Sequence, residues 1–165
     1  MRSKIFAWLK QAGIYLLLFV VMSVAVDWWR GKDFPTTQIP GLVGTSLQGE
    51  NINITELSKG QAVVVYYWAS WCSVCTFVSP AVNTLSQYYP VLTVALSSGS
   101  DARVNKYLQI KDYDFTVIND DKSALGREWK VSVTPTIFIV KDGEVKSFTT
   151  GFTSLPGLWW RLITA

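Results

Sequence analysis

Histidine is absent from the 165 residues of the chain, and its absence excludes whole classes of site. Without an imidazole there can be no His-dependent hydrolase triad, no histidine-ligated haem and none of the common catalytic zinc centres. Charged residues are scarce at 16%, against 49% hydrophobic residues, a composition too apolar for a disordered chain. The net charge of +3 comes from Arg2, Lys4 and Lys10. The rest of the chain is nearly neutral, so we expect no nucleic-acid partner.

Cysteine is also rare, with only Cys72 and Cys75 present. A single close pair cannot form a framework of structural disulfides, and no second pair exists to complete a four-cysteine zinc site. Three interpretations remain: a redox-active pair, a small structural disulfide, or two thiolate ligands of a shared metal ion. A disulfide across so short a loop would constrain the unfolded chain little. The chain has no histidine that could join the two thiolates in a copper site. We therefore expect the pair itself to be the redox centre, with no added cofactor and no metal.

The first 30 residues have the pattern of a membrane segment. An uncharged run, Gln11–Val26, can be extended by apolar neighbours to the ~20 residues that span a bilayer. Positive charges precede this run and charges nearly cancel after it, so the positive-inside rule places the N-terminus in the cytoplasm and the rest outside. Ser23-Val24-Ala25 also fits a signal-peptide cleavage site, and this alternative stays open. We expect an anchor (or uncleaved signal sequence) at residues 1–30, a linker at residues 31–40 and a domain at residues 41–165.

The domain alternates β-rich runs with helical periodicity, which predicts an α/β fold. An irregular hairpin is expected at residues 41–54, and the apolar run at residues 62–68 is typical of a central strand covered on both faces. The other expected strands are residues 91–96, 115–118, 136–140 and 145–150, the last two joined by a turn at residues 141–144. The expected helices run from Cys72 to Tyr89 with Pro80 inside, over residues 101–110 and 123–129, and from Ser154 or Pro156 onward.

The cysteine pair falls where the predicted central strand gives way to a helix. A helix N-terminus carries partial positive charge and unpaired N–H groups, which stabilise a thiolate and lower the pKa of a thiol. We expect Cys72 to be the exposed nucleophile in the first turn of this helix, and Cys75, one turn inward, to resolve a mixed disulfide. Trp71, directly before the nucleophile, is expected to be a partly exposed ring that shapes the surface where a partner docks.

Two stretches resemble the thioredoxin superfamily. The first is Trp68–Cys75, with Pro80 five residues after the second cysteine, and the second is Val133–Thr136. The resemblance implies a thioredoxin fold, in which a central mixed β-sheet is flanked by helices and here extended by an N-terminal β-hairpin. It also implies a cis peptide bond before Pro135, beside the cysteines, and a substrate-docking role for Thr134 and Pro135. The Thr134 backbone would then pair with an extended substrate strand.

The anchored, exported arrangement resembles the membrane-tethered TlpA-like thioredoxins of Gram-negative bacteria, and within them the suppressor of copper sensitivity protein D type. This resemblance implies disulfide exchange with protein partners in the periplasm, at the inner membrane, by a monomeric soluble domain. It further implies that a membrane thiol reductase supplies electrons. Any effect on copper tolerance would be indirect, because copper oxidises thiols that this protein would repair.

Three departures from better-known relatives bear on the mechanism. Tyr66 stands where the general thioredoxin pattern has a buried aspartate, which puts proton handling by a carboxylate in doubt. Ser73-Val74 replaces the Pro-His of strongly oxidising relatives, and Val78 replaces the glutamate of cytochrome c maturation relatives, which weakens a haem-maturation role. The missing histidine favours a reductant or isomerase-like direction. The alternative function is a non-catalytic module that binds a peptide or copper.

Two further groups of residues are expected to have no part in the chemistry. Trp159-Trp160 is predicted to lie on the packed face of the last helix, together with Leu155, Leu158, Leu162 and Ile163. Two adjacent side chains cannot both point inward, so one tryptophan is free to contact a partner or the membrane. Four aspartates are expected to be loop charges, because they are too scattered for a carboxylate pair or a calcium loop. They are Asp112, Asp114, Asp120 and Asp121.

Overall fold

The computed structural model describes residues 11, 13–15, 17–18, 21–22 and 39–165. The chain divides into two compact units, Met1–Phe34 and Pro35–Ala165, and the fold described below belongs to the second. In the described part of the chain, no helix combines the length and the apolar character needed to cross a membrane. The predicted anchor and linker lie almost entirely outside the described residues and remain predictions.

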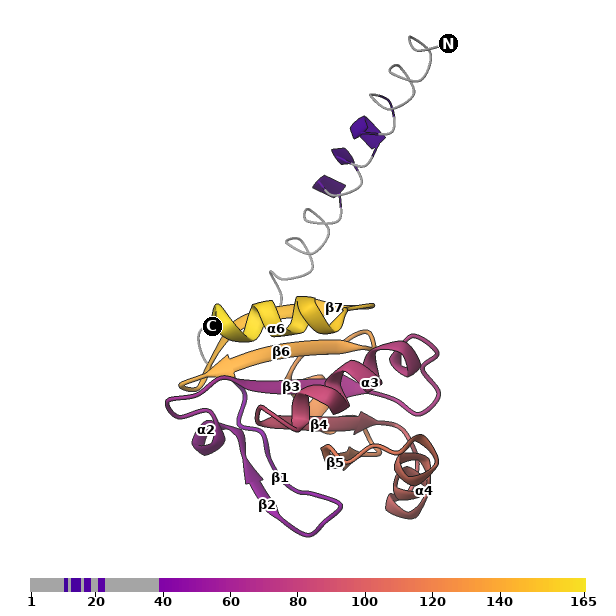
Figure 1. The fold of residues 1–165 in the computed structure, drawn as a ribbon. Helices are drawn as coiled ribbons and strands as arrows, with labels where there is room; N and C mark the ends of the chain where they lie inside the picture. The colour runs from indigo at the N-terminus through magenta and orange to yellow at the C-terminus, as the bar shows by residue number, and fades with distance from the viewer. Residues whose placement is uncertain (1–10, 12, 16, 19–20, 23–38) are drawn as a thin grey trace. The chain divides into compact units, whose positions relative to one another are not determined.

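A five-stranded mixed sheet forms the centre of the second unit, with strand order β5-β4-β3-β6-β7 (Figure 1). The middle strand, β3 (Val63–Trp68), pairs in parallel with β4 (Val91–Leu96) and antiparallel with β6 (Thr136–Lys141). The edge strands are β5 (Thr116–Asp120) and β7 (Glu144–Thr150). Every residue of β3 and β4 is buried, because both strands lie inside the sheet and are covered on both faces. The mixed sheet and its α/β class agree with the sequence prediction.

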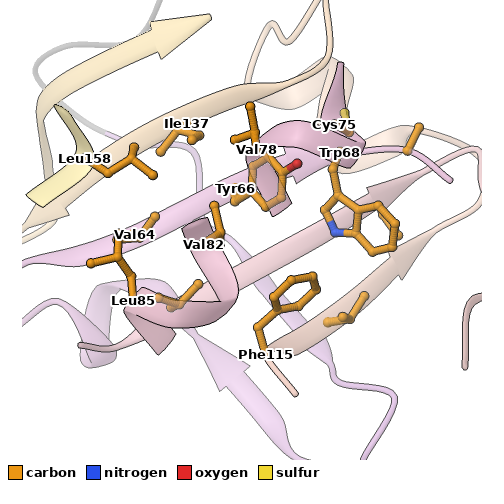
Figure 2. Close-up of a cluster of buried hydrophobic side chains, with 14 of the residues drawn as sticks. Val64, Tyr66, Trp68, Cys75, Val78, Val82, Leu85, Phe115, Ile137 and Leu158 are labelled. Carbon is orange, nitrogen blue, oxygen red and sulfur yellow. The ribbon is translucent and has the colours of Figure 1, made fainter. Parts of the chain in front are cut away.

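One large core cluster joins the sheet to three helices. From β3 it takes Val64, Tyr66 and Trp68, whose side chains point to the same face because alternate residues of a strand do so (Figure 2). The helices that add buried side chains to this cluster are α3 (Cys75–Ser86), α4 (Asp101–Lys111) and α6 (Leu155–Ile163). The start of α3 is thereby held against the end of β3, which is where the cysteines lie.

The opposite face of β3 is covered by other aromatic side chains. Tyr67 packs there against Trp129 and Phe138, with ring centroids 5.8 and 5.9 Å away. A two-stranded antiparallel hairpin precedes the sheet, as predicted for residues 41–54. The remaining elements are β1 (Val43–Thr45), β2 (Asn51–Asn53), α2 (Ile54–Leu57) and α5 (Ala124–Glu128). The sequence prediction has no counterpart of α2, a single turn in which the Asn53 side chain accepts a hydrogen bond from the N–H of Thr55.

The packing predicted for the last helix is confirmed for Leu158 and Leu162, and it is wrong for Leu155, Ile163 and the two tryptophans. Trp159 and Trp160 are 48% and 63% exposed. Leu158 and Leu162, four residues apart on one face of α6, are the side chains that it buries. The two tryptophans follow Leu158 around the helix, so neither reaches the core.

The interpretation of Asp120 as a loop charge is also wrong. Asp120 is the last residue of β5 and is only 6% exposed. Its carboxylate accepts hydrogen bonds from the N–H groups of Ala124 at 2.7 Å and Gly126 at 2.9 Å. These N–H groups lie in the first turn of α5, where a helix has no internal acceptors for them. Asp120 therefore caps α5 from the end of the preceding strand.

Candidate active site

The two cysteines lie at the carboxyl end of β3. A turn follows the strand, in which the N–H of Cys72 donates to the carbonyl of Ala69 at 3.1 Å. The helix begins at Cys75 itself, three residues later than the predicted start. The turn delays the helix, so Cys72 precedes it rather than lying in its first turn. Both cysteines are free thiols in this structure.

Cys72 is more enclosed than the sequence predicts. Its side chain is only 6% exposed, and that of Cys75 is fully buried, so Cys72 is the more exposed member of the pair, as expected, by a small margin. The Cys72 sulfur is enclosed because it lies between the start of α3 and the carbonyl oxygen of Thr134, 3.5 Å away. The neighbours of Cys72 in the chain, Trp71 and Val74, have exposed side chains, and so does Val133, which precedes Thr134.

The start of α3 polarises the Cys72 sulfur. The N–H of Cys75 donates to this sulfur at 3.2 Å, and it is one of the helix N–H groups that lack an acceptor within the helix. Burial by itself raises the pKa of Cys72. Hydrogen bonds with the side chains of Cys75 and Thr134, and with the backbone of Cys75 and Val74, outweigh that effect and lower the pKa below its ordinary value. Cys72 therefore ionises more readily than an ordinary cysteine.

Cys75 has the opposite character. Burial, followed by the hydrogen bond that its thiol makes with Cys72, raises the pKa of Cys75 to about 12. When Cys72 is a thiolate, Cys75 keeps its proton, and its S–H donates a hydrogen bond to the Cys72 sulfur. The geometry therefore supports the predicted division of labour, in which Cys72 attacks and Cys75 resolves.

The segment that carries Thr134 and Pro135 directly precedes β6, far from the cysteines in the sequence. The peptide bond between these two residues is cis, as the resemblance to thioredoxins implied. Thr134 lies against the Cys72 sulfur, although 62 positions separate the two residues in the chain. The carbonyl of Pro135 accepts a hydrogen bond from the N–H of Gly151 at 2.8 Å, which attaches this segment to the end of β7. The structure thus brings Cys72, Cys75 and Thr134 together, with Pro135 directly behind.

Trp71 forms part of the rim of the site. Its ring is 65% exposed, and its Nε1–H donates to the carbonyl of Ser97 at 3.1 Å. A hollow of about 410 Å³ lies beside the ring and is also lined by Val133 and Thr134. Because Thr134 also contacts Cys72, the hollow adjoins the nucleophile. The partly exposed ring agrees with the expectation from sequence.

Some residues of the site were not singled out from the sequence. The carbonyl of Ser97 accepts the hydrogen bond from the Trp71 ring, and its hydroxyl is 2.8 Å from that of Ser123, which lines the hollow. The Ser79 hydroxyl forms a hydrogen bond with the Tyr66 hydroxyl beneath the cysteines, with 3.0 Å between the two oxygens. The usable signal for Ser79 is its spacing, four residues after Cys75, which places both on one face of the helix.

Metal ligands are not clustered in the described residues. These residues contain no group of three or more Cys, Asp or Glu side chains that could hold a metal ion.

Comparison with known proteins finds relatives that match most of the chain. The model of the AhpC/TSA family matches residues 31–148. A Thioredoxin-like protein of Haemophilus influenzae is 37% identical over 158 residues, which cover 95% of this chain and 94% of that protein. The Thiol-disulfide oxidoreductase ResA of Bacillus cereus is 30% identical over 143 residues, covering 80% of this chain and 82% of the relative.

Solved structures show the same fold at lower identity. One is a secreted Mycobacterium tuberculosis disulfide oxidoreductase described as homologous to Escherichia coli DsbE. It superposes with a TM-score of 0.63 at 18% sequence identity, covering 75% of this chain and 96% of that one. This likeness supports the thioredoxin-like architecture of residues 39–165.

Proposed function

Because this chain belongs to the AhpC/TSA family, we propose that its cysteine pair exchanges disulfides with partner proteins. The chain is a thioredoxin-like thiol-disulfide oxidoreductase, in keeping with its ResA relative. Cys72 is the nucleophile and Cys75 the resolving thiol. The single observation that carries this assignment is the hydrogen bond from the first residue of α3 to the Cys72 sulfur, which favours the thiolate at that position alone.

The exchange takes place in two steps. The Cys72 thiolate attacks a sulfur of the partner disulfide, so that a Cys72–partner bond forms, the partner S–S bond breaks and one partner thiolate leaves. Cys75 then loses its proton and attacks the Cys72 sulfur, forming the Cys72–Cys75 disulfide and releasing the second partner thiolate. Two electrons pass from the cysteine pair to the partner, which takes up two protons and becomes a dithiol. The reverse sequence would oxidise a partner dithiol.

Partner docking is assigned to the rim of the site. Thr134 and Pro135 would present backbone beside the attacking sulfur, where an extended partner segment could pair with the Thr134 backbone. The exposed Trp71 ring and the adjoining hollow would receive a side chain of that segment.

The direction of exchange is assigned as reduction of partner disulfides. No histidine lies between the cysteines to stabilise a thiolate in the manner of strong oxidants. A reductant in an oxidising space needs a supply of electrons, for which we propose a membrane thiol reductase. A link to copper tolerance of the suppressor of copper sensitivity protein D type would follow indirectly, through repair of thiols that copper has oxidised.

We place the working domain outside the cytoplasm, tethered to the inner membrane by residues 1–30. Support comes from the apolar run and its flanking charges, and from the secreted M. tuberculosis relative. Fractionation of cells that express the full chain should recover it in the membrane at its unprocessed mass. Recovery of a shorter soluble form would replace the tether by a cleaved signal peptide.

The assignment is tested by trapping. In a Cys75→Ala variant the resolving thiol is missing, so Cys72 should accumulate mixed disulfides with partner proteins that disappear on reduction. A variant with both cysteines replaced is the matched control and should form none. If folded Cys75→Ala yields no adducts in cells, the alternative of a non-catalytic binding module replaces the proposed function.

A further inference from the structure

Tyr66 carries its hydroxyl into the apolar core directly beneath the cysteines. It lies in the middle strand of the sheet and is fully buried. Its hydroxyl is 3.0 Å from the hydroxyl of Ser79 on α3, which is fully buried too. Figure 2 shows the Tyr66 ring between β3 and α3, with its oxygen directed toward the part of the helix that carries Cys75 and Val78. Two hydroxyl groups are thus placed inside a predominantly apolar core.

The same two hydroxyls face the resolving sulfur. Cys75 and Ser79 are four residues apart and therefore lie on one face of α3. Tyr66 faces them from the strand, and its hydroxyl is among the groups that lower the pKa of Cys75. Among the described residues, the one buried charged side chain is Asp120, which lies at the end of β5. Tyr66 and Ser79 are the polar side chains that reach Cys75 from beneath.

We propose that the Tyr66 hydroxyl, held by Ser79, donates a hydrogen bond to the Cys75 sulfur while that sulfur carries negative charge. The proposal rests on the proposed function, because Cys75 becomes a thiolate only during disulfide exchange. Tyr66 and Ser79 then serve at the position where general thioredoxins have a carboxylate, and they do so without changing their own charge.

The chemistry of the resolving step defines what the hydroxyl does. As the Cys75 S–H bond breaks, its proton passes to the partner thiolate released in the first step or, when that thiolate is a weak base, to the buffer. The Cys75 electron pair then forms the bond to the Cys72 sulfur, and the bond from Cys72 to the partner breaks. Between these events the negative charge resides on a buried sulfur. A donor is needed there, because an unpaired buried charge is costly.

Tyr66 acts as a donor and not as a base. Burial is the main cause that raises the pKa of Tyr66 far above its ordinary value, so the phenol keeps its proton at any physiological pH. Ser79 can in turn donate to the Tyr66 oxygen, which strengthens the donor that Tyr66 presents to sulfur. The hydrogen bond from Tyr66 lowers the pKa of Cys75, against the larger opposite effect of burial.

The test separates attack by Cys72 from resolution by Cys75. The reduced full-length chain is mixed with dithiobis-nitrobenzoate, an aromatic disulfide that releases a coloured thiolate at each step. The first phase of colour reports attack by Cys72, and the second reports resolution by Cys75. Tyr66→Phe keeps the ring and removes the hydroxyl. It should slow the second phase by about tenfold or more, because a hydrogen bond to a charged group is lost, and leave the first within about twofold.

Tyr67→Phe is the matched control. It removes a buried tyrosine hydroxyl from the next residue of the same strand, on the opposite face, where that hydroxyl makes no hydrogen bond within the described residues. Its second phase should match that of the wild type. Ser79→Ala should slow the second phase by a smaller factor than Tyr66→Phe, and it provides an independent reading should Tyr66→Phe fail to fold.

The outcomes distinguish this proposal from the proposed function. Slowing of the second phase in Tyr66→Phe and Ser79→Ala, but not in Tyr67→Phe, supports the proposal. A wild-type second phase in both Tyr66→Phe and Ser79→Ala overturns it, as does equal slowing in Tyr67→Phe, which would mean that packing alone is responsible. A wild-type chain that releases no second equivalent of coloured thiolate would refute the proposed function itself.

Discussion

At the scale of single residues, the two sulfurs differ more in their hydrogen bonds than in their burial. Both are enclosed, but only Cys72 accepts the N–H at the start of α3. The sequence predicted this polarity from the position of the cysteines between a strand and a helix. It did not predict the burial of Cys72, because the covering group, Thr134, comes from a distant segment. The partial exposure of Trp71 was predictable, since the ring lies next to a site that must receive partners.

The pKa difference predicts selective alkylation of Cys72. Only a thiolate reacts with iodoacetamide, and the lowered pKa of Cys72 means that its thiolate persists to a lower pH than that of a free cysteine, at ~8.5. In the reduced chain, Cys72 should reach half its maximal rate below that pH, as followed by mass spectrometry. Cys75, whose pKa is raised to about 12, should remain largely unmodified there. Equal labelling of both cysteines in the folded protein would contradict the assignment.

We expect the Trp71→Ala variant to lose activity toward large substrates more than toward small ones. Removing an exposed aromatic contact should raise the activation free energy for reaction with a protein disulfide by roughly 1 to 1.5 kcal/mol. This corresponds to a fall in kcat/KM of about five- to tenfold. The rate with a small disulfide should change far less. Trp160→Ala removes a ring of similar exposure, 63% against 65%, from outside the hollow and is the control. Equal losses in the two variants would remove the docking role from Trp71.

At the scale of elements, the sequence predicted what periodicity and burial determine. The buried runs of β3 and β4 and the hairpin of β6 and β7 have strong patterns, and their positions were predictable to within a residue or two. The start of α3 was not, because the turn that delays it depends on a backbone hydrogen bond between Cys72 and Ala69. The exposure of Trp160 was missed because apolar character alone does not determine which face of α6 is buried.

Asp120 gives the clearest element-scale prediction. Its carboxylate accepts two N–H groups at the start of α5 from a buried position. Asp120→Ala would leave these donors without that acceptor, so it should lower the free energy of unfolding by about 1 to 3 kcal/mol. Chemical denaturation followed by circular dichroism measures the change. The exposed neighbour Asp121 is the control, and its replacement by alanine should change stability by less than about 0.5 kcal/mol. Similar effects of the two replacements would count against the capping role.

At the scale of the whole molecule, two segments that are far apart in the sequence of one domain form the site. The strand-to-helix junction supplies the cysteines, and the segment before β6 supplies Thr134 and Pro135. Periodicity cannot predict a contact across 62 residues, and here the resemblance to thioredoxins supplied it. Neither periodicity nor the resemblance to thioredoxins predicts the hydroxyl pair of Tyr66 and Ser79. The sequence showed only that the usual carboxylate is missing, whereas the packing of α3 on β3 shows which groups stand in its place.

The reduction potential of the full-length chain tests the central claim most directly. Equilibration with glutathione buffers, followed by quantification of the Cys72–Cys75 disulfide, should give one reversible two-electron transition nearer to about −270 mV than to about −120 mV. Such a value would identify a reductant that depends on a supply of electrons. A value near about −120 mV would reverse the assigned direction. The absence of any reversible transition between dithiol and disulfide would contradict the account as a whole.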